Sequence, residues 1–172
     1  MPANRYFIAI VPPEPIAAEI YELKEYMRDK YKSKGALNSP AHITLHMPFE
    51  WEDEEKLVVS LRAFSFAPFS IQLKDFDCFE PRVIFVGVER NIALEEMQRN
   101  LVRFCKRELD LFNAEYQDRP YHPHVTIAFR DLRKPMFHEA WNEFKNRRYR
   151  AGFECARLSL MKHDGKTWRE FS

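Results

Sequence analysis

The stretch PAHITLHMPF, residues 40–49, decides the fold, because HPHVTIAF at residues 122–129 repeats its centre. Each copy contains a histidine, an aliphatic β-branched residue, a threonine and a further aliphatic residue. Alternate side chains of a β-strand lie on one face, so the histidine and threonine of each copy should point together. The aliphatic residues should face the core. We therefore predict two strands that each present one imidazole and one hydroxyl, from His42, Thr44, His124 and Thr126.

The segments around the two copies also resemble each other. RYFIAIV at residues 5–11 precedes a helical pattern and the first motif, and RVIFVGV at residues 82–88 precedes a second helical pattern and the second motif. The copies are separated by nearly half the chain, which indicates two similar lobes related by a pseudo-twofold axis. A length of 172 residues fits one domain, residues 1–172, of two interleaved lobes. We expect the two motif strands to lie side by side across a central cleft.

Hydrophobic periodicity predicts the other elements. Helical spacing of apolar residues begins after Pro15 and fades before Gly35, and it recurs near residues 57–61, 94–104 and 135–144. Strands are predicted at residues 5–11, 69–73, 82–88 and 156–160, within both motifs, and as a short edge at 167–171. The first motif strand should close at Pro48, and a polar loop should cover about residues 113–121.

Composition narrows the class of partner. The net charge is +1, without the basic excess that long nucleic acids usually require, so a nucleotide or an RNA terminus fits better than a long duplex. No signal peptide or apolar run of about 20 residues is visible, so we expect no membrane partner. The cysteines Cys78, Cys105 and Cys155 are odd in number and widely spaced, which predicts free thiols. We expect a soluble cytoplasmic monomer.

The residue types of the motifs suit chemistry at a phosphate. Hydrolysis of a phosphodiester needs a base for the attacking water and an acid for the leaving oxygen, and imidazole, with a pKa near ~6.5, can serve as either. Two imidazoles on opposite sides of a phosphorus fit an in-line displacement, each typically worth about 10²–10⁴-fold. Threonine hydroxyls can donate hydrogen bonds to the non-bridging oxygens. This mechanism requires no metal and no cofactor.

Metal binding is the alternative use of these histidines. His42 could share a strand face with His46, and His122 with His124, so four imidazoles could converge. Neither motif contains a carboxylate, and threonine is a poor zinc ligand, so we predict no metal site. His46 and His122 are better interpreted as flanking residues, and His138 and His163 receive no role.

Aromatic and basic residues near the motifs are candidates for substrate contacts. Phe7, Phe49, Tyr121 and Phe129 could stack on a nucleobase, although in a chain this rich in phenylalanine core packing is the better interpretation for any one of them. Arg130, six residues after His124, could reach a phosphate at the mouth of the cleft. A regular strand would place Phe129 and Arg130 on opposite faces.

With tandem His-hydrophobic-Thr-hydrophobic motifs, the chain resembles the 2H phosphoesterase superfamily, and its opening RYFIAI followed by prolines resembles the bacterial 2′-5′ RNA ligase-like and cyclic phosphodiesterase branch. The resemblance implies a bilobal α+β fold, with two antiparallel-rich sheets around a central cleft and flanking helices. It also implies metal-independent action on 2′,3′-cyclic phosphates or 2′-5′ linkages, with His124 as the base, His42 as the acid, and Thr44 and Thr126 as phosphate contacts. The two histidines could exchange roles for the reverse reaction. Many bacterial members have arginine where this chain has Phe129.

The expected activity is hydrolysis of a 2′,3′-cyclic phosphate to a 2′-phosphate. Two alternatives remain open at this stage: ligation of RNA ends through a 2′-5′ bond, and a module that binds a nucleotide or an RNA end without catalysis.

Overall fold

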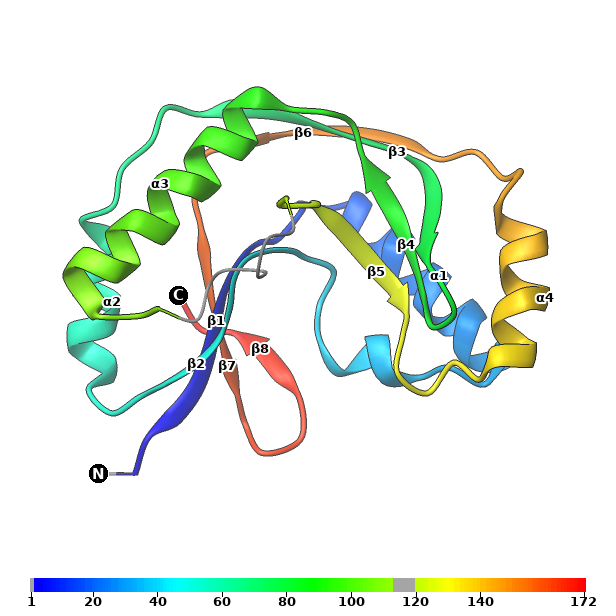
Figure 1. Cartoon of the computed structure of the whole chain (residues 1–172), viewed down its shortest axis with the longest axis horizontal. Coiled ribbons are helices and arrows are strands. Elements are labelled where there is room, and N and C mark those ends of the chain that lie inside the picture. Colours follow the sequence, from blue (N-terminus) through cyan, green and yellow to red (C-terminus); the bar gives the residue numbers. More distant parts are fainter. Residues whose placement is uncertain (1, 113–119) are drawn as a thin grey trace.

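The computed structural model describes residues 2–112 and 120–172, with two antiparallel four-stranded sheets (Figure 1). The first half of the chain contains β1 (Asn4–Ile10), α1 (Ile16–Tyr31), the short 3₁₀ helix η1 (Gly35–Asn38), β2 (Ile43–Trp51), α2 (Glu54–Arg62) and β3 (Phe69–Phe79). The second half contains β4 (Val83–Val88), α3 (Ile92–Leu109), β5 (His124–Ala128), α4 (Lys134–Phe144), β6 (Arg150–Cys155), β7 (Ser159–His163) and β8 (Trp168–Glu170).

The two sheets confirm the predicted bilobal α+β fold. One has the strand order β2-β1-β7-β8 and the other has the order β5-β4-β3-β6. In each sheet a motif strand is at one edge and pairs antiparallel with the strand that precedes it in the repeat, β2 with β1 and β5 with β4. The repeat therefore places the two motifs at equivalent positions of the two sheets.

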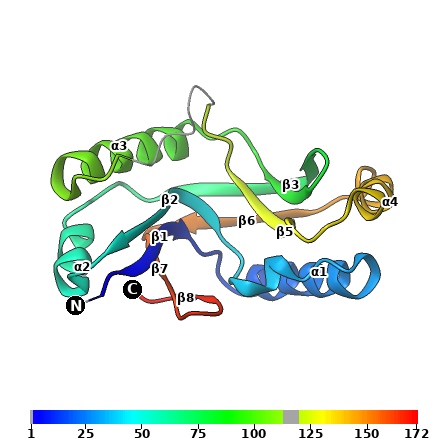
Figure 2. The same cartoon turned by 60° about the horizontal axis from the view of Figure 1, so that its bottom comes forward.

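The long helices of the repeat pack on the opposite half. Helix α1 follows β1 in the chain but contacts β5 and α4, whereas α3 follows β4 but contacts β2. Figures 1 and 2 show α1 and α4 grouped at one end of the molecule and α2 and α3 at the other. Helix α1 of the first half of the chain thus packs on a strand of the second half, and α3 of the second half packs on a strand of the first. No helix in the described ranges has the length and apolar character needed to cross a bilayer.

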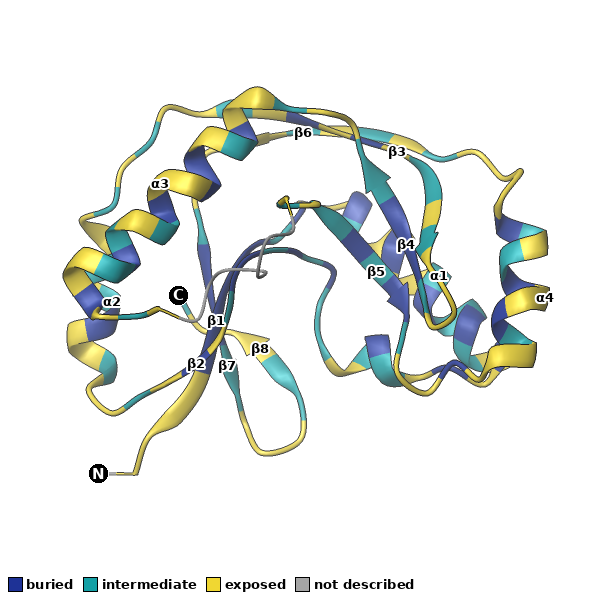
Figure 3. Ribbon diagram, in the orientation of Figure 1, coloured by how far each residue is buried: buried dark blue, intermediate teal, exposed yellow. Residues whose placement is uncertain are grey.

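Buried apolar side chains from both sheets form one large cluster (Figure 3). It contains the aliphatic residues of the motifs, Ile43, Leu45, Val125 and Ile127, each at most 1% exposed. A smaller cluster of Phe7, Ala9 and Met161 lies apart from it. Since Tyr6 and Ile8 belong to the large cluster, β1 is buried on both faces.

Two strand predictions were wrong. Strand β2 does not close at Pro48 but continues to Trp51, because its pairing with β1 shifts by one residue at two places, one of them opposite Pro48. Proline is tolerated at such irregularities and in edge strands. The strand expected at residues 156–160 starts only at Ser159, and the sequence did not reveal β6, whose alternation includes a glycine and exposed charges. The polar loop expected near 113–121 falls mostly outside the described residues.

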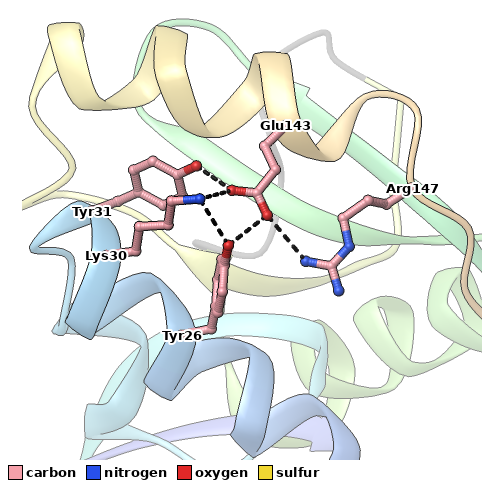
Figure 4. Close-up of polar contacts among 5 residues, drawn as sticks. All are labelled: Tyr26, Lys30, Tyr31, Glu143 and Arg147. Carbon is pink, nitrogen blue, oxygen red and sulfur yellow. Dashed lines mark hydrogen bonds and ion pairs between the residues drawn. The ribbon is translucent and has the colours of Figure 1, made fainter.

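A carboxylate of α4 ties that helix to α1 (Figure 4). Glu143 accepts hydrogen bonds from the hydroxyls of Tyr26, at 2.6 Å, and Tyr31, and from the ammonium of Lys30 at 2.8 Å. Arg147 adds an ion pair at 3.5 Å. Burial alone would raise the pKa of Glu143, but the hydrogen bonds from Lys30, Tyr26 and Tyr31 lower it to about 2. The network therefore holds an ionised carboxylate between the two helices.

Candidate active site

Each motif histidine is oriented by a carbonyl two residues before it. Nδ1 of His42 lies 2.8 Å from the carbonyl oxygen of Pro40, and Nδ1 of His124 lies 2.7 Å from that of His122. A carbonyl only accepts, so Nδ1 of each ring carries the proton and Nε2 is left for chemistry. The two copies thus hold the same tautomer by the same local contact.

Aromatic side chains support both rings. His42 packs on Phe7 of β1 with the ring centroids 4.9 Å apart. His124 packs on Phe85 of β4 at 4.9 Å and meets Phe79 edge-on at 5.1 Å. In both cases a phenylalanine from an adjacent strand limits the movement of the imidazole.

The structure brings the two motifs together. Strands β2 and β5 are in contact, and the hydroxyl of Tyr121, just before β5, donates a 2.7 Å hydrogen bond to the carbonyl of Thr44. The two histidines are close enough for the charge of His124 to lower the pKa of His42. Thr44 and Thr126 are both half-buried on these strands. Tyr121 was predicted as a substrate contact, and in the structure its hydroxyl joins the segment before β5 to β2 by this hydrogen bond.

Burial favours the uncharged form of both imidazoles. Burial lowers the pKa of His42 to about 4; the hydrogen bond to Pro40 opposes this, and the charges of Lys24 and His124 add to it. Burial also lowers the pKa of His124, again opposed by its carbonyl contact, and the charge of His122 adds to the lowering. An anion bound between the rings would favour their protonated forms.

A hollow of about 310 Å³ adjoins the first motif. His42, Thr44, Phe7 and Arg130, all predicted from the sequence, are among the side chains that line it. The same hollow is lined by Arg5, His163, Lys166 and Trp168, to which the sequence had assigned no role.

Trp168 contacts three of the other side chains that line the hollow. Its ring meets Phe7 edge-on at 4.7 Å and His163 at 4.9 Å, and the guanidinium of Arg5 lies 5.4 Å from it. These residues come from β1 and from the β7–β8 hairpin, which are adjacent only because β7 pairs with β1. The only sequence signal was the short strand expected at residues 167–171.

The expectation that Phe129 and Arg130 face opposite sides was wrong, because both line the hollow. Strand β5 ends at Ala128, so strand alternation does not extend to these residues. Arg130 has a φ of 60°, in the left-handed region, and its guanidinium lies 5.2 Å from the Phe129 ring. A local turn therefore directs the arginine toward the cleft.

Phe49 and His46 lie in the core and do not line this hollow. Phe49 is 5% exposed and packs on Tyr6 and His46, with centroid distances of 6.1 and 5.3 Å. His46 is fully buried, with Nδ1 2.7 Å from the carbonyl of Met47 and Nε2 without a hydrogen-bond partner in the described structure. The register shift between Thr44 and His46 explains the burial of His46, which alternation would have placed beside His42 and Thr44, whereas Phe49 lies on the core side together with Ile43 and Leu45.

The four histidines considered as metal ligands are not assembled. His46 is buried in the core, whereas His122 is exposed and packs edge-on against Phe79 at 5.0 Å. Within residues 2–112 and 120–172, no three side chains of His, Cys, Asp or Glu are grouped as a metal site would need.

Two antiparallel sheets, each with one His-x-Thr motif at an edge strand and with the two motif strands in contact, are typical of the 2H type of phosphoesterase architecture, although the hollow of the first motif is not lined by His124 or Thr126. The sequence profile of the 2′-5′ RNA ligase superfamily matches residues 12–167, so the chain belongs to this superfamily of 2H phosphoesterases.

Two relatives are similar to this chain in sequence, and a solved structure shares its fold. A Geobacillus kaustophilus protein, with a provisional name as a phosphoesterase, is 32% identical over 147 residues, which are 82% of this chain and 78% of that protein. The RNA 2′,3′-cyclic phosphodiesterase of Bacillus subtilis is 30% identical over 131 residues, 72% of this chain and 69% of the relative. Escherichia coli LigT without ligand superposes with a TM-score of 0.66 at 17% identity, covering 100% of this chain and 96% of LigT, which shows the shared fold.

Proposed function

We propose that this protein hydrolyses 2′,3′-cyclic phosphates of nucleotides or RNA ends to 2′-phosphates by acid–base catalysis with two histidines. The observation that carries the proposal is the matched pair of Nδ1 contacts, His42 to Pro40 and His124 to His122, which leaves Nε2 of both rings for proton transfer. The name of the Bacillus subtilis relative supports this substrate class, as does a crystal structure of Escherichia coli LigT with 3′-AMP.

The reaction needs one proton removed and one supplied. Nε2 of His124 takes a proton from water as the water oxygen bonds to phosphorus. The bond from phosphorus to the 3′ oxygen then breaks, and protonated His42 gives that oxygen a proton, which leaves a free 3′ hydroxyl and a 2′-phosphate. The hydroxyls of Thr44 and Thr126 donate to the non-bridging oxygens, where charge increases in the transition state.

The acid must gain its proton when the substrate binds. His42, with a pKa of about 4, is neutral in the empty cleft at pH 7. A phosphodiester anion beside the ring stabilises the imidazolium and raises that pKa. Arg130, in the same hollow, can hold the anion.

A second candidate reaction is ligation through a 2′-5′ bond, which the superfamily membership favours. A 5′ hydroxyl would replace water as the nucleophile, or, in the reverse direction, the 2′-5′ bond would be cleaved. The same two proton transfers serve both reactions, so only the nucleophile distinguishes them.

The test is turnover of nucleoside 2′,3′-cyclic phosphates in excess EDTA, with and without an oligonucleotide that carries a 5′ hydroxyl. We expect a 2′-phosphate product, and a loss of about 10²–10⁴-fold in kcat for His42→Ala and for His124→Ala. His138→Ala is the matched control, since His138 is an exposed histidine of α4. Activity that disappears with EDTA and returns with zinc would overturn the mechanism. Binding without product would instead identify a binding module, and a joined product would identify the ligase.

A further inference from the structure

A second, strongly basic hollow adjoins the first. It measures about 730 Å³ and is lined by Tyr31, Lys32, Lys34, Arg130, Asp131, Arg133 and Met136; we call it the outer hollow. Arg130 lines both hollows, and Gly35 of the first hollow follows Lys34 of the second in the chain. The outer hollow is therefore the continuation of the cleft on the side of α1 and α4.

Of the four cationic side chains of the outer hollow, Lys34, Arg130 and Arg133 form no ion pair with a carboxylate among residues 2–112 and 120–172. The fourth, Lys32, donates a 3.2 Å hydrogen bond to the carbonyl of Asp29, and its charge lowers the pKa of that residue's carboxyl. All four are exposed. Elsewhere arginines on α1, after α4 and on β8 are paired with acidic residues, as in Arg147 with Glu143 or Arg169 with Asp164. The outer hollow therefore has an excess of positive charge next to the proposed phosphate site, with four cations and one carboxylate in its lining.

The single carboxylate of the outer hollow is already occupied by hydrogen-bond donors. Asp131 accepts from the hydroxyl of Ser33 at 2.9 Å, from the backbone N–H of Lys34 at 2.9 Å and from that of Gly35 at 3.1 Å. These bonds fix the turn that carries Lys34 next to Arg130. Asp131 thus shapes the turn and leaves the neighbouring cations to a ligand.

The floor of the outer hollow is less polar than its rim. Tyr31 is 3% exposed and its hydroxyl is bonded to Glu143, while Met136 is half-buried. A basic rim over an aromatic and thioether floor fits a ribose–phosphate unit, because the phosphate meets the cations and the sugar or base meets the floor.

We propose that the outer hollow binds the phosphate that precedes the terminal nucleotide, so the preferred substrate is an RNA strand with a 2′,3′-cyclic end and not a mononucleotide. The inference rests on the proposed function, which places the cyclic phosphate between His42 and His124. A strand with such an end continues only in its 5′ direction, and its next phosphate must leave the first hollow. Arg130, shared by both hollows, lies at that exit.

The experiment compares kcat/KM for three substrates: adenosine 2′,3′-cyclic phosphate, the same compound with a 5′-phosphate, and a triadenylate with a 2′,3′-cyclic end. The variant is Lys34→Gln with Arg133→Gln, two exposed side chains outside the first hollow. Its matched control is Lys56→Gln with Arg99→Gln, which removes two exposed cations from α2 and α3. We expect the wild type and the control to prefer the triadenylate by at least about tenfold, as one or two phosphate contacts would give. The outer-hollow variant should lose most of that preference and keep its rate on the unphosphorylated mononucleotide within about twofold.

The salt dependence of binding gives a second readout. For a labelled triadenylate with a 2′-phosphate end, the slope of log Kd against log salt should fall by about 0.7 for each phosphate contact removed. Equal preference and slope in the variant and the control would overturn the proposal. An advantage seen equally with the 5′-phosphorylated mononucleotide would reduce the site to one for a terminal phosphate and overturn the preference for a strand.

Failure of the proposed function is distinguishable from failure of this inference. If the wild type cleaves the mononucleotide but shows no strand preference, the hydrolase assignment stands and the strand site falls. If no substrate is cleaved but the triadenylate binds with an affinity that depends on Lys34 and Arg133, the strand site stands and the hydrolase assignment falls.

Discussion

Lys24 provides the sharpest test of how the cleft is built, because it is a buried ammonium behind the acid–base pair. Its side chain is 2% exposed, and its Nζ donates a 2.8 Å hydrogen bond to the carbonyl of Ser39, next to the Pro40 that orients His42. Burial lowers its pKa from 10.5 to about 8, and its charge contributes to the low pKa of His42. Lys24→Met keeps the length of the side chain and removes the charge.

The expected change in stability follows from that pKa. A drop from 10.5 to about 8 corresponds to about 3 kcal/mol of cost at pH 7, at ~1.4 kcal/mol for each pKa unit. The lost charged hydrogen bond is worth about 1.5–3 kcal/mol, and the half-buried Ser39 carbonyl can turn to water instead. We therefore expect the free energy of unfolding of Lys24→Met at pH 7 to equal that of the wild type or to exceed it by up to about 2 kcal/mol.

The stability difference between Lys24→Met and the wild type should change with pH in a defined direction. Between pH 8 and 10.5 the folded wild type has released the Lys24 proton while the unfolded chain still holds it, so wild-type stability rises through this range. The difference between variant and wild type should therefore shift in favour of the wild type as the pH rises from 7 to 10. Urea denaturation at several pH values measures it, with Lys56→Met, an exposed lysine on α2, as control. In the activity assay, the acidic limb of kcat/KM should move to higher pH as the pKa of His42 rises. A loss of more than about 3 kcal/mol at pH 7 with an unchanged acidic limb would refute this account.

Three further predictions concern titrating groups. The profile of kcat/KM should be bell-shaped, with its maximum on the acid side of neutrality, because it reports the lowered pKa values of His42 and His124 in the free protein; a flat profile from pH 5 to 8 would contradict the pairing. His46→Leu removes a buried imidazole whose pKa is lowered by burial, so it should lessen the loss of stability as the pH falls below ~6.5, and chemical denaturation at pH 5 and 7.5 would show this as a pH-dependent difference of at most about 2 kcal/mol. Glu143→Gln should destabilise by about 1–3 kcal/mol at pH 7, an effect that is full above pH ~4.5 and lost toward pH 2, where Glu143 protonates; denaturation midpoints at pH 7 and pH 3 measure it.

The sequence predicted those parts of the site that depend on strand alternation alone. His42 and Thr44 are half-buried while Ile43 and Leu45 are buried, and β5 repeats the pattern with Val125. The duplicated pattern also predicted two lobes and the meeting of the motif strands. For a short motif on a regular strand, the sequence alone therefore predicts which side chains share a face.

The positions of the other residues around the hollow depended on strand ends, register shifts and tertiary contacts, which hydrophobic periodicity does not reveal. Arg130 enters the cleft because β5 ends two residues earlier and its φ is positive. His46 turns into the core because β2 shifts its register against β1 between Thr44 and His46. Trp168 reaches Phe7 only through the pairing of β7 with β1, and α1 and β5 meet to place Lys34 beside Arg130.

The exchange of helices between the halves explains why the site is at their joint. Helix α1 carries Lys24 and leads to the turn of Ser39 and Pro40, so it positions His42 of one sheet while it packs on β5, the strand of His124, in the other. Helix α3 packs in turn on β2, where Gln98 donates a 3.2 Å hydrogen bond to the carbonyl of Leu45 within the first motif. His42 is therefore positioned by its own sheet and by α1, the helix that also contacts the strand of His124. Separating the two imidazoles would require breaking these helix contacts together with the Tyr121–Thr44 bond, so the spacing of His42 and His124 is set by the core of the protein and not by a flexible hinge.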